Sequence, residues 1–243
     1  MSPPVFLVDA LPDGTETVLA GAEGHHAATV RRLRPGAVVQ LSDGAGGLAE
    51  CTVTGVGPDR LTLAVLGRSR VDRPRPRFVV VQALAKGERG ELAVELLTEV
   101  GADEVVPWAA ARSVAVWRAE RGVKALARWR ATAREAAKQS RRAWLPLVSE
   151  PHGTAEVAAR IVAAGGGLVL HGAAADPLGG APLPTGGELV VVVGPEGGLT
   201  PDELAAFTAA GARPVRLGPT VLRTSTAGAA ALAALSVRTG RWT

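Results

Sequence analysis

The chain has 243 residues, of which 47% are hydrophobic, so one large or two modest domains with buried cores are possible. It has a single cysteine, Cys51, no apolar run of about eighteen residues and no signal-peptide pattern after Met1. These features exclude an internal disulfide, and we expect a soluble cytoplasmic protein without a membrane partner. The net charge is +4, but residues 112–142 alone hold ten Lys or Arg and two acids, which indicates a polyanionic partner at one place.

Residues 5–70 contain short apolar segments, some with period-two alternation, separated by turn signals such as Asp43-Gly44 and Gly57-Pro58-Asp59. This pattern is typical of a small β-barrel. The expected strands are Val5–Val8, Ala37–Ser42, Leu48–Val56 and Arg60–Leu66.

One helical piece, Gly24–Leu33, interrupts these strands and carries three arginines near its end. These arginines, Arg31, Arg32 and Arg34, could form a solvated face, but their place on a small barrel favours contact with RNA. The adjacent pair His25-His26 lies in the same piece. No Cys, Asp or third His lies at ligand spacing, so we expect a surface or capping role for the pair and no metal site.

A stiff linker divides the chain. Proline alternates with other residues in Val71–Arg77, which prevents a helix. We place the boundary here, with residues 1–72 as a β-barrel domain and residues 73–243 as a second domain. From Phe78 onward strands alternate with helices, which predicts an α/β fold with a parallel sheet.

Two amphipathic helices are expected early in the second domain. One spans Glu88–Val100 and places on one face Leu92, Leu96, Leu97 and Val100. The other spans Val123–Arg142 and places at helical spacing Leu126, Trp129, Ala133 and Ala136. Its remaining faces are basic, and one acid within it, Glu135, cannot pair with all these charges. We favour an RNA-facing surface over a merely solvated helix face.

Shorter elements follow. We expect a strand at Leu147–Ser149, a helix at Thr154–Ala163 and a strand that ends in His171-Gly172. The segment Asp176–Gly187 is rich in Gly and Pro and is predicted to be a surface loop.

The stretch from Glu188 to Gly228 organises the rest of the chain. Leu189–Val193 is an unbroken β-branched run that suits a strand buried on both faces. After the loop Gly194–Gly198, Thr200 and Glu203 form a capping box for a helix that ends near Gly211. A second strand and a helix of small residues follow, at Arg213–Leu217 and Ala227–Val237.

Two strands thus end in glycine-containing loops, and ligands of open α/β sheets bind at such places. The sequence GPEGGLT has neither the spacing of a dinucleotide fingerprint nor the Gly-Lys-Ser/Thr ending of a P-loop. Taken alone, the loop Gly194–Gly198 could equally be a tight turn without a ligand.

Together, GPEGGLTPDE and LGPTVLRTSTA resemble the loops of the SPOUT class of RNA methyltransferases, and most closely those of the RsmE family. The segments HHAATVRRLRPG, ALAKGERGELAVELLTEVGADEVVP and EAAKQSRR are also similar to that family. The resemblance implies a trefoil-knotted parallel sheet, an N-terminal PUA-like β-barrel and a homodimer. It also implies S-adenosylmethionine as cofactor and methylation at N3 of a uridine in 16S ribosomal RNA of the small subunit.

The resemblance assigns residues to the cofactor and to RNA. The cofactor set comprises three loops: Leu170, His171, Gly172; Gly194, Pro195, Glu196, Gly197, Gly198; and Leu217, Gly218, Val221, Leu222, Arg223, Thr224, Ala227. The RNA set consists of Arg31, Arg32, Arg34, Arg112, Lys138, Arg141 and Arg142.

Uridine N3 carries a proton at neutral pH, so an enzyme must remove it or stabilise the resulting anion. Arg223 is the candidate for stabilising that charge, and Glu196 is the candidate to accept the proton or hold the cofactor. No metal is needed. Where the family commonly has a glutamate, this chain has Ser225, so the role of that glutamate cannot be transferred.

Two other functions are compatible with parts of the sequence. A non-catalytic RNA-binding protein of the same fold would keep the basic residues. A nucleotide-binding metabolic enzyme would share the α/β pattern, but the absent phosphate motifs disfavour it.

Overall fold

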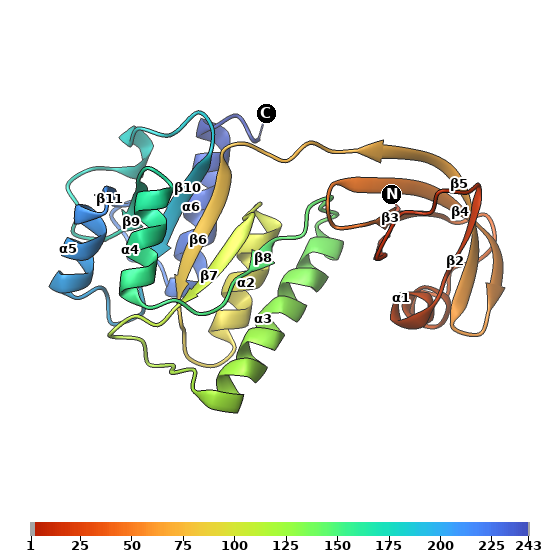
Figure 1. Ribbon diagram of the computed structural model, residues 1–243, viewed down its shortest axis with the longest axis horizontal. Helices are drawn as coiled ribbons and strands as arrows, with labels where there is room; N and C mark the ends of the chain where they lie inside the picture. The colour runs from red at the N-terminus through yellow and green to blue at the C-terminus, as the bar shows by residue number, and fades with distance from the viewer. Residues whose placement is uncertain (1–2, 243) are drawn as a thin grey trace. The chain divides into compact units, whose positions relative to one another are not determined.

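The computed structural model describes residues 3–242 and divides into two compact units (Figure 1). The first unit runs to Arg73 and also includes Ala137–Leu145, and the second consists of Pro74–Ala136 and the chain from Pro146 onward. We predicted a single boundary after residue 72. The segment Ala137–Leu145, which belongs to the first unit, was not predicted to do so.

A five-stranded sheet forms the first unit, in the order β1-β3-β4-β5-β2. Its strands are β1 (Val5–Leu7), β2 (Glu16–Leu19), β3 (Val38–Ser42), β4 (Gly47–Gly57) and β5 (Arg60–Arg70). Strands β1 and β3 are parallel, and the other pairs are antiparallel. The alternation in β4 buries Ala49, Cys51 and Val53 in one core with Phe6 and Leu41, and burial raises the pKa of the Cys51 thiol. Strand β2 was not predicted.

The predicted helical piece begins and ends earlier than expected, as a short α-helix α1 (Gly21–His25) followed by a π-helical turn η1 (His26–Val30). His25 Nδ1 lies 2.7 Å from Asp59 Oδ1, and His26 packs edge-on against Phe6. Hydrogen bonds from His25 and Thr29 hold the pKa of Asp59 below its usual value. Among residues 3–242, no group of three or more His, Cys, Asp or Glu is arranged to hold a metal ion.

Residues 137–145 complete the first unit. Gly46 donates its N–H to Ala143, Leu145 donates to Gly44, and the Trp144 indole donates to Val71. Lys138 forms an ion pair with Glu23 at 3.0 Å, with only 11% of its side chain exposed. The long helix α3 (Ala119–Gln139) also ends before Arg141, whose φ of 57° is left-handed. The prediction that this helix continues to Arg142 is therefore wrong, and Arg141 and Arg142 lie beyond its end.

The second unit contains a fully parallel six-stranded sheet in the order β11-β9-β10-β6-β7-β8. Its strands are β6 (Arg77–Ala83), β7 (Glu104–Trp108), β8 (Leu147–Val148), β9 (Gly167–Leu170), β10 (Glu188–Val193) and β11 (Ala212–Val215). The central strands β6 and β10 are continuous apolar runs because both of their faces are covered. This confirms the predicted parallel α/β sheet.

Helices cover both faces of this sheet (Figure 1). One face packs against α2 (Arg89–Glu99), α3 and α6 (Thr224–Arg238), and the other against α4 (Thr154–Ala163) and α5 (Pro201–Ala209). A short 3-10 turn, η2 (Leu178–Gly180), lies in the predicted surface loop. None of the helices within residues 3–242 is long and apolar enough to cross a membrane.

Helix α2 buries the expected face only in part, since Leu97 is buried and Val100 packs against the core but Leu92 does not. Leu92 is 41% exposed, whereas Ala93, Val94 and Leu97 are fully buried. Gly90 of the same stripe lies against the Trp129 ring, where an added Cβ would come within 3.0 Å. Small residues form part of the contact because α2 packs closely against its neighbours, so counting large apolar residues missed the Gly90 and Ala93 side of the buried stripe.

Candidate functional site

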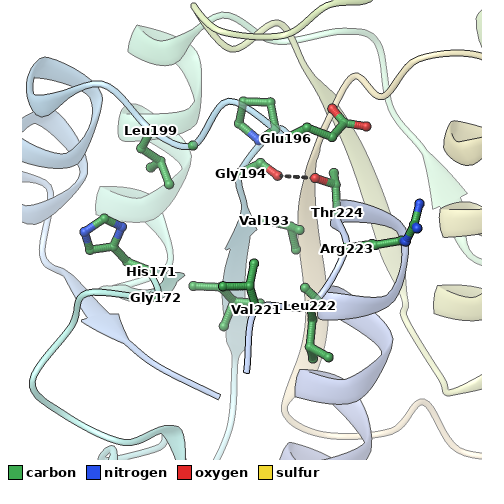
Figure 2. Close-up of a pocket in the computed structure, with 14 residues that line it drawn as sticks. His171, Gly172, Val193, Gly194, Glu196, Leu199, Val221, Leu222, Arg223 and Thr224 are labelled. Atoms are coloured by element: carbon green, nitrogen blue, oxygen red, sulfur yellow. Dashed lines mark hydrogen bonds between the residues drawn. The ribbon is translucent and has the colours of Figure 1, made fainter. Parts of the chain in front are cut away.

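A pocket of about 360 Å³ lies where strands β9 and β10 end and α6 begins (Figure 2). This is the carboxyl edge of the parallel sheet, where ligands of α/β proteins bind. Its volume lies within the range of small-molecule sites. The lining residues are Leu170, His171, Gly172, Val193, Gly194, Pro195, Glu196, Gly198, Leu199, Val221, Leu222, Arg223, Thr224 and Ala227.

One wall of the pocket is the loop Gly194–Thr200, which connects β10 to α5. Gly198 has φ of +69°, a conformation that glycine adopts without strain, and turns the backbone into the pocket wall. Thr200 caps α5 by accepting the N–H of Glu203, whose carboxylate accepts the N–H of Thr200 in return. This capping box, predicted from the sequence, fixes where the loop ends.

The other wall is the segment that leads into α6. The Thr224 hydroxyl donates to the carbonyl of Gly194 at 3.1 Å and so joins the two walls (Figure 2). Below it, an added Cβ on Gly228 would lie 2.9 Å from Leu97 Cδ2, so only glycine allows α6 to pack this closely. The helix begins at Thr224, three residues before the expected start at Ala227. The first turn of α6 therefore borders the pocket directly.

Three side chains with acid-base or charged groups line the pocket: His171, Glu196 and Arg223. In Figure 2, His171 and Leu199 lie on one side and Arg223 and Thr224 on the other, with the Arg223 side chain directed away from His171. Glu196 Oε1 lies 3.8 Å from Arg89 Nη1, and the Glu196 side chain is 29% exposed. Arg223 is exposed, so its guanidinium can meet a ligand that enters from solvent.

Both units of the chain are similar to parts of known RNA methyltransferases. Residues 72–236 match the RNA methyltransferase domain family, and residues 19–66 match the RNA methyltransferase PUA domain family. The ribosomal RNA small subunit methyltransferase E of Mycobacterium bovis is 54% identical over 243 residues, covering 98% of this chain and 93% of that protein. The enzyme of the same name from Bacillus subtilis is 32% identical and covers 91% of this chain and 90% of its own length.

The chain belongs to the RsmE family of RNA methyltransferases. A solved member from Neisseria gonorrhoeae, bound to S-adenosyl methionine, has a TM-score of 0.89 and 29% identity, and the match covers 100% of both chains. This confirms the expected combination of a SPOUT-type parallel sheet with a PUA-like N-terminal unit. The trefoil knot stays a prediction.

The pocket gathers twelve of the fifteen residues predicted for the cofactor in this RsmE member, and leaves out Gly197, Leu217 and Gly218. Gly197 faces the other way, since a Cβ there would lie 3.0 Å from Arg112 Cβ. Leu217 and Gly218 line a neighbouring pocket of about 340 Å³, which also contains Leu222. Val193 and Leu199 also line the pocket and were not predicted, although both flank the predicted loop.

The predicted RNA-binding residues fall into separate groups. Arg31, Arg32 and Arg34 are exposed, and the structure of residues 3–242 shows no hydrogen bond or ion pair from their side chains. Arg112 instead donates from Nη1 to the carbonyls of Gly197 at 3.2 Å and Leu199 at 3.3 Å. The expectation that Arg112 serves RNA missed this contact because its partners lie more than eighty residues away in sequence.

Proposed function

We propose that this protein methylates N3 of a uridine in 16S ribosomal RNA of the small subunit, with S-adenosylmethionine as the methyl donor. The observation that carries the proposal is the pocket at the carboxyl edge of the sheet, formed by three loops in a chain of the RsmE family. The structural relative bound to S-adenosyl methionine covers the whole chain and supports the choice of cofactor.

The lining suits this cofactor. Apolar side chains such as Val193, Leu199 and Leu222 offer contact to the apolar parts of a nucleoside, and backbone groups next to Gly194 and Gly198 are accessible for hydrogen bonds. The Glu196 carboxylate suits a cationic ligand. When bound, S-adenosylmethionine supplies a methyl group on a positively charged sulfur.

The protein side of the reaction is positioning and charge stabilisation. Arg223, which lines the pocket at the N-cap of α6, would stabilise the negative charge that develops on the uridine as N3 loses its proton. Glu196, on the opposite loop, is the candidate proton acceptor. The exposed arginines Arg31, Arg32 and Arg34 would contact the phosphates of the RNA.

The proposal includes a cytoplasmic location, where ribosomal subunits are assembled, and a homodimer. Val221, at the rim of the pocket, is 96% exposed, and Leu222 beside it is 38% exposed. Large apolar side chains in such positions support contact with a second copy of the chain. A concentration series in analytical ultracentrifugation tests the dimer.

Calorimetric titration with S-adenosylmethionine, ATP and NAD tests the cofactor. We expect saturable binding of S-adenosylmethionine at one site per chain and no binding of ATP or NAD. Binding of either nucleotide in place of S-adenosylmethionine would support a nucleotide-dependent metabolic enzyme instead. A non-catalytic RNA-binding protein would bind RNA without transferring a methyl group.

A further inference from the structure

The buried carboxylate of Glu203 connects two segments that are far apart in sequence. Only 4% of Glu203 is exposed. Its Oε2 atom accepts the N–H of Thr200 at 2.8 Å and the Thr200 hydroxyl at 3.1 Å, which completes the cap of α5. Its Oε1 atom accepts the backbone N–H of Ala111 at 2.7 Å. The helix cap uses only Oε2. The hydrogen bond from Ala111 to Oε1 therefore links α5 to a separate segment of the chain.

Arg112, the next residue after Ala111, reaches the same loop from the same segment. Its Nη1 atom donates to the carbonyls of Gly197 and Leu199. Gly197 lies against Arg112, where an added Cβ would make a tight contact of 3.0 Å with Arg112 Cβ. Three hydrogen bonds thus hold residues 197–203 to residues 111–112, and both segments belong to the second unit.

We propose that Glu203 and Arg112 are positioning residues that hold the Gly194–Thr200 loop in the conformation that binds S-adenosylmethionine. The inference rests on the proposed function of this pocket. Neither side chain lines the pocket, but Gly198 and Leu199 do, and the backbone around both is fixed by these bonds. Without the bonds, a smaller fraction of molecules has a binding-competent loop, and the apparent Kd rises in proportion.

A positioning role predicts a specific kinetic pattern. When S-adenosylmethionine is saturating, the ligand itself holds the loop, so kcat should stay near the wild-type value. The KM for S-adenosylmethionine should rise instead, because only the free loop is affected. A residue that touches the reacting atoms would lower kcat, and a residue that only stabilises the fold would lower the melting temperature without changing KM.

Glu203→Gln tests the link most specifically, because the amide has one acceptor oxygen and one NH2 donor where the carboxylate has two acceptor oxygens. If its oxygen faces the two donors of Thr200, its NH2 group faces the N–H of Ala111, and the link between the segments is lost while the cap is kept. The matched control is Glu156→Gln in α4. Glu156 caps its own helix by accepting the N–H of Gly153 at 2.7 Å, and within residues 3–242 its side chain makes no hydrogen bond or ion pair with the pocket loop.

Arg112→Met removes the donors and keeps much of the side-chain volume, whereas Arg112→Lys keeps donors that reach a carbonyl. We expect Glu203→Gln and Arg112→Met to weaken S-adenosylmethionine binding about tenfold, the net effect of losing about one hydrogen bond. Arg112→Lys should recover most of this loss, and Glu156→Gln should bind like the wild type.

The measurement is calorimetric Kd for S-adenosylmethionine without RNA, together with amide hydrogen exchange of the free protein. Exchange at Ala111 and in the Gly194–Thr200 loop should be faster in Glu203→Gln and unchanged in Glu156→Gln. Wild-type affinity and exchange in both Glu203→Gln and Arg112→Met would overturn the inference. If the wild-type protein itself failed to bind S-adenosylmethionine, the proposed function would fail instead.

Discussion

The two edges of the parallel sheet differ in their residues: glycine-containing loops lie at the carboxyl edge, and paired charged residues lie at the amino edge. At the carboxyl edge, β9 and β10 run into loops containing Gly172, Gly194 and Gly198, and a pocket opens between them. At the amino edge, Arg77, Glu104 and Glu188 begin their strands and form a network with Arg160 of α4. Glu104 is almost buried, with 6% of its side chain exposed, and also accepts the Ser149 hydroxyl at 2.6 Å.

Arg241, which follows α6, is also held at the amino edge. After α6, Arg241 pairs with Asp103 at 2.7 Å and lies over the Phe78 ring at 4.1 Å. The same helix α6 begins at the pocket on the opposite edge. Charged residues at the amino edge hold the starts of the strands and the end of α6. Because this edge stabilises the sheet, the carboxyl edge can consist of small residues and open loops that bind a ligand.

The largest expected effect comes from Glu104→Ala. Removing one partner of a buried charge network leaves two arginines, Arg77 and Arg160, without this carboxylate. We expect a loss of about 3–5 kcal/mol in the free energy of unfolding. Chemical denaturation measures it, and affinity for S-adenosylmethionine should be unchanged well below the melting transition.

The control for this experiment is Glu150→Ala. Glu150 pairs with Arg130 at 2.9 Å, but its side chain is 73% exposed, so its loss should cost less than about 1 kcal/mol. Equal costs for the two variants would mean that the amino-edge network is no special source of stability.

Arg223→Ala tests the chemistry of the carboxyl edge. Losing one charge-assisted hydrogen bond to the transition state costs about 1.5–3 kcal/mol, which slows methyl transfer about ten- to a hundredfold. Single-turnover rates at saturating cofactor and RNA measure this effect. If the saturated rate stays the same while cofactor affinity falls, Arg223 is a cofactor ligand and its catalytic assignment is wrong.

Gly198→Val tests the shape of the pocket loop. A β-branched residue at φ of +69° is strained by about 1–3 kcal/mol, so the loop should shift and S-adenosylmethionine should bind at least about tenfold more weakly. Gly187→Val is the matched control, because Gly187 has the same φ and equally open surroundings but precedes β10 at the amino edge. It should carry the same strain without loss of affinity, and a similar loss in both variants would show a general effect on folding.

The smallest effect concerns the exposed arginines of the first unit. If Arg31 and Arg34 contact phosphates of single-stranded RNA, replacing both with alanine should make the plot of log affinity against log salt shallower by about 1.4. Binding of matched and mismatched RNA should weaken alike. Arg213→Ala, an exposed arginine on β11 paired with Asp176, should leave the slope unchanged. Parallel slopes for the double variant and the wild type would exclude these two residues as phosphate contacts.

Local sequence patterns predicted much of the fold. The helix at Thr154–Ala163 and the capping box of Thr200 and Glu203 are found as expected. Both depend on interactions within a few residues, which a single sequence displays. The start of α6 was predicted three residues late, because Thr224-Ser225-Thr226 has the composition of a loop and the cap residue, Arg223, has no capping side-chain bond.

Long-range contacts could not be predicted in the same way. Lys138 belongs to a basic run in the sequence, but its partner Glu23 lies in another part of the first unit. Arg112 bonds to carbonyls of the pocket loop, and nothing in its own neighbourhood indicates this. The pocket could be predicted from the glycine loops, because the ends of neighbouring parallel strands bring such loops together. The direction in which Gly197 faces could not be predicted, because it depends on Arg112, more than eighty residues away.

The most direct test of the account is methyl transfer to ribosomal RNA. The protein is incubated with labelled S-adenosylmethionine and small ribosomal subunits from cells that lack this enzyme, and the 16S RNA is digested and separated by mass spectrometry. The account predicts labelled N3-methyluridine at a single position, formed much more slowly by Arg223→Ala. Absence of label, or label on another atom or base, would contradict it.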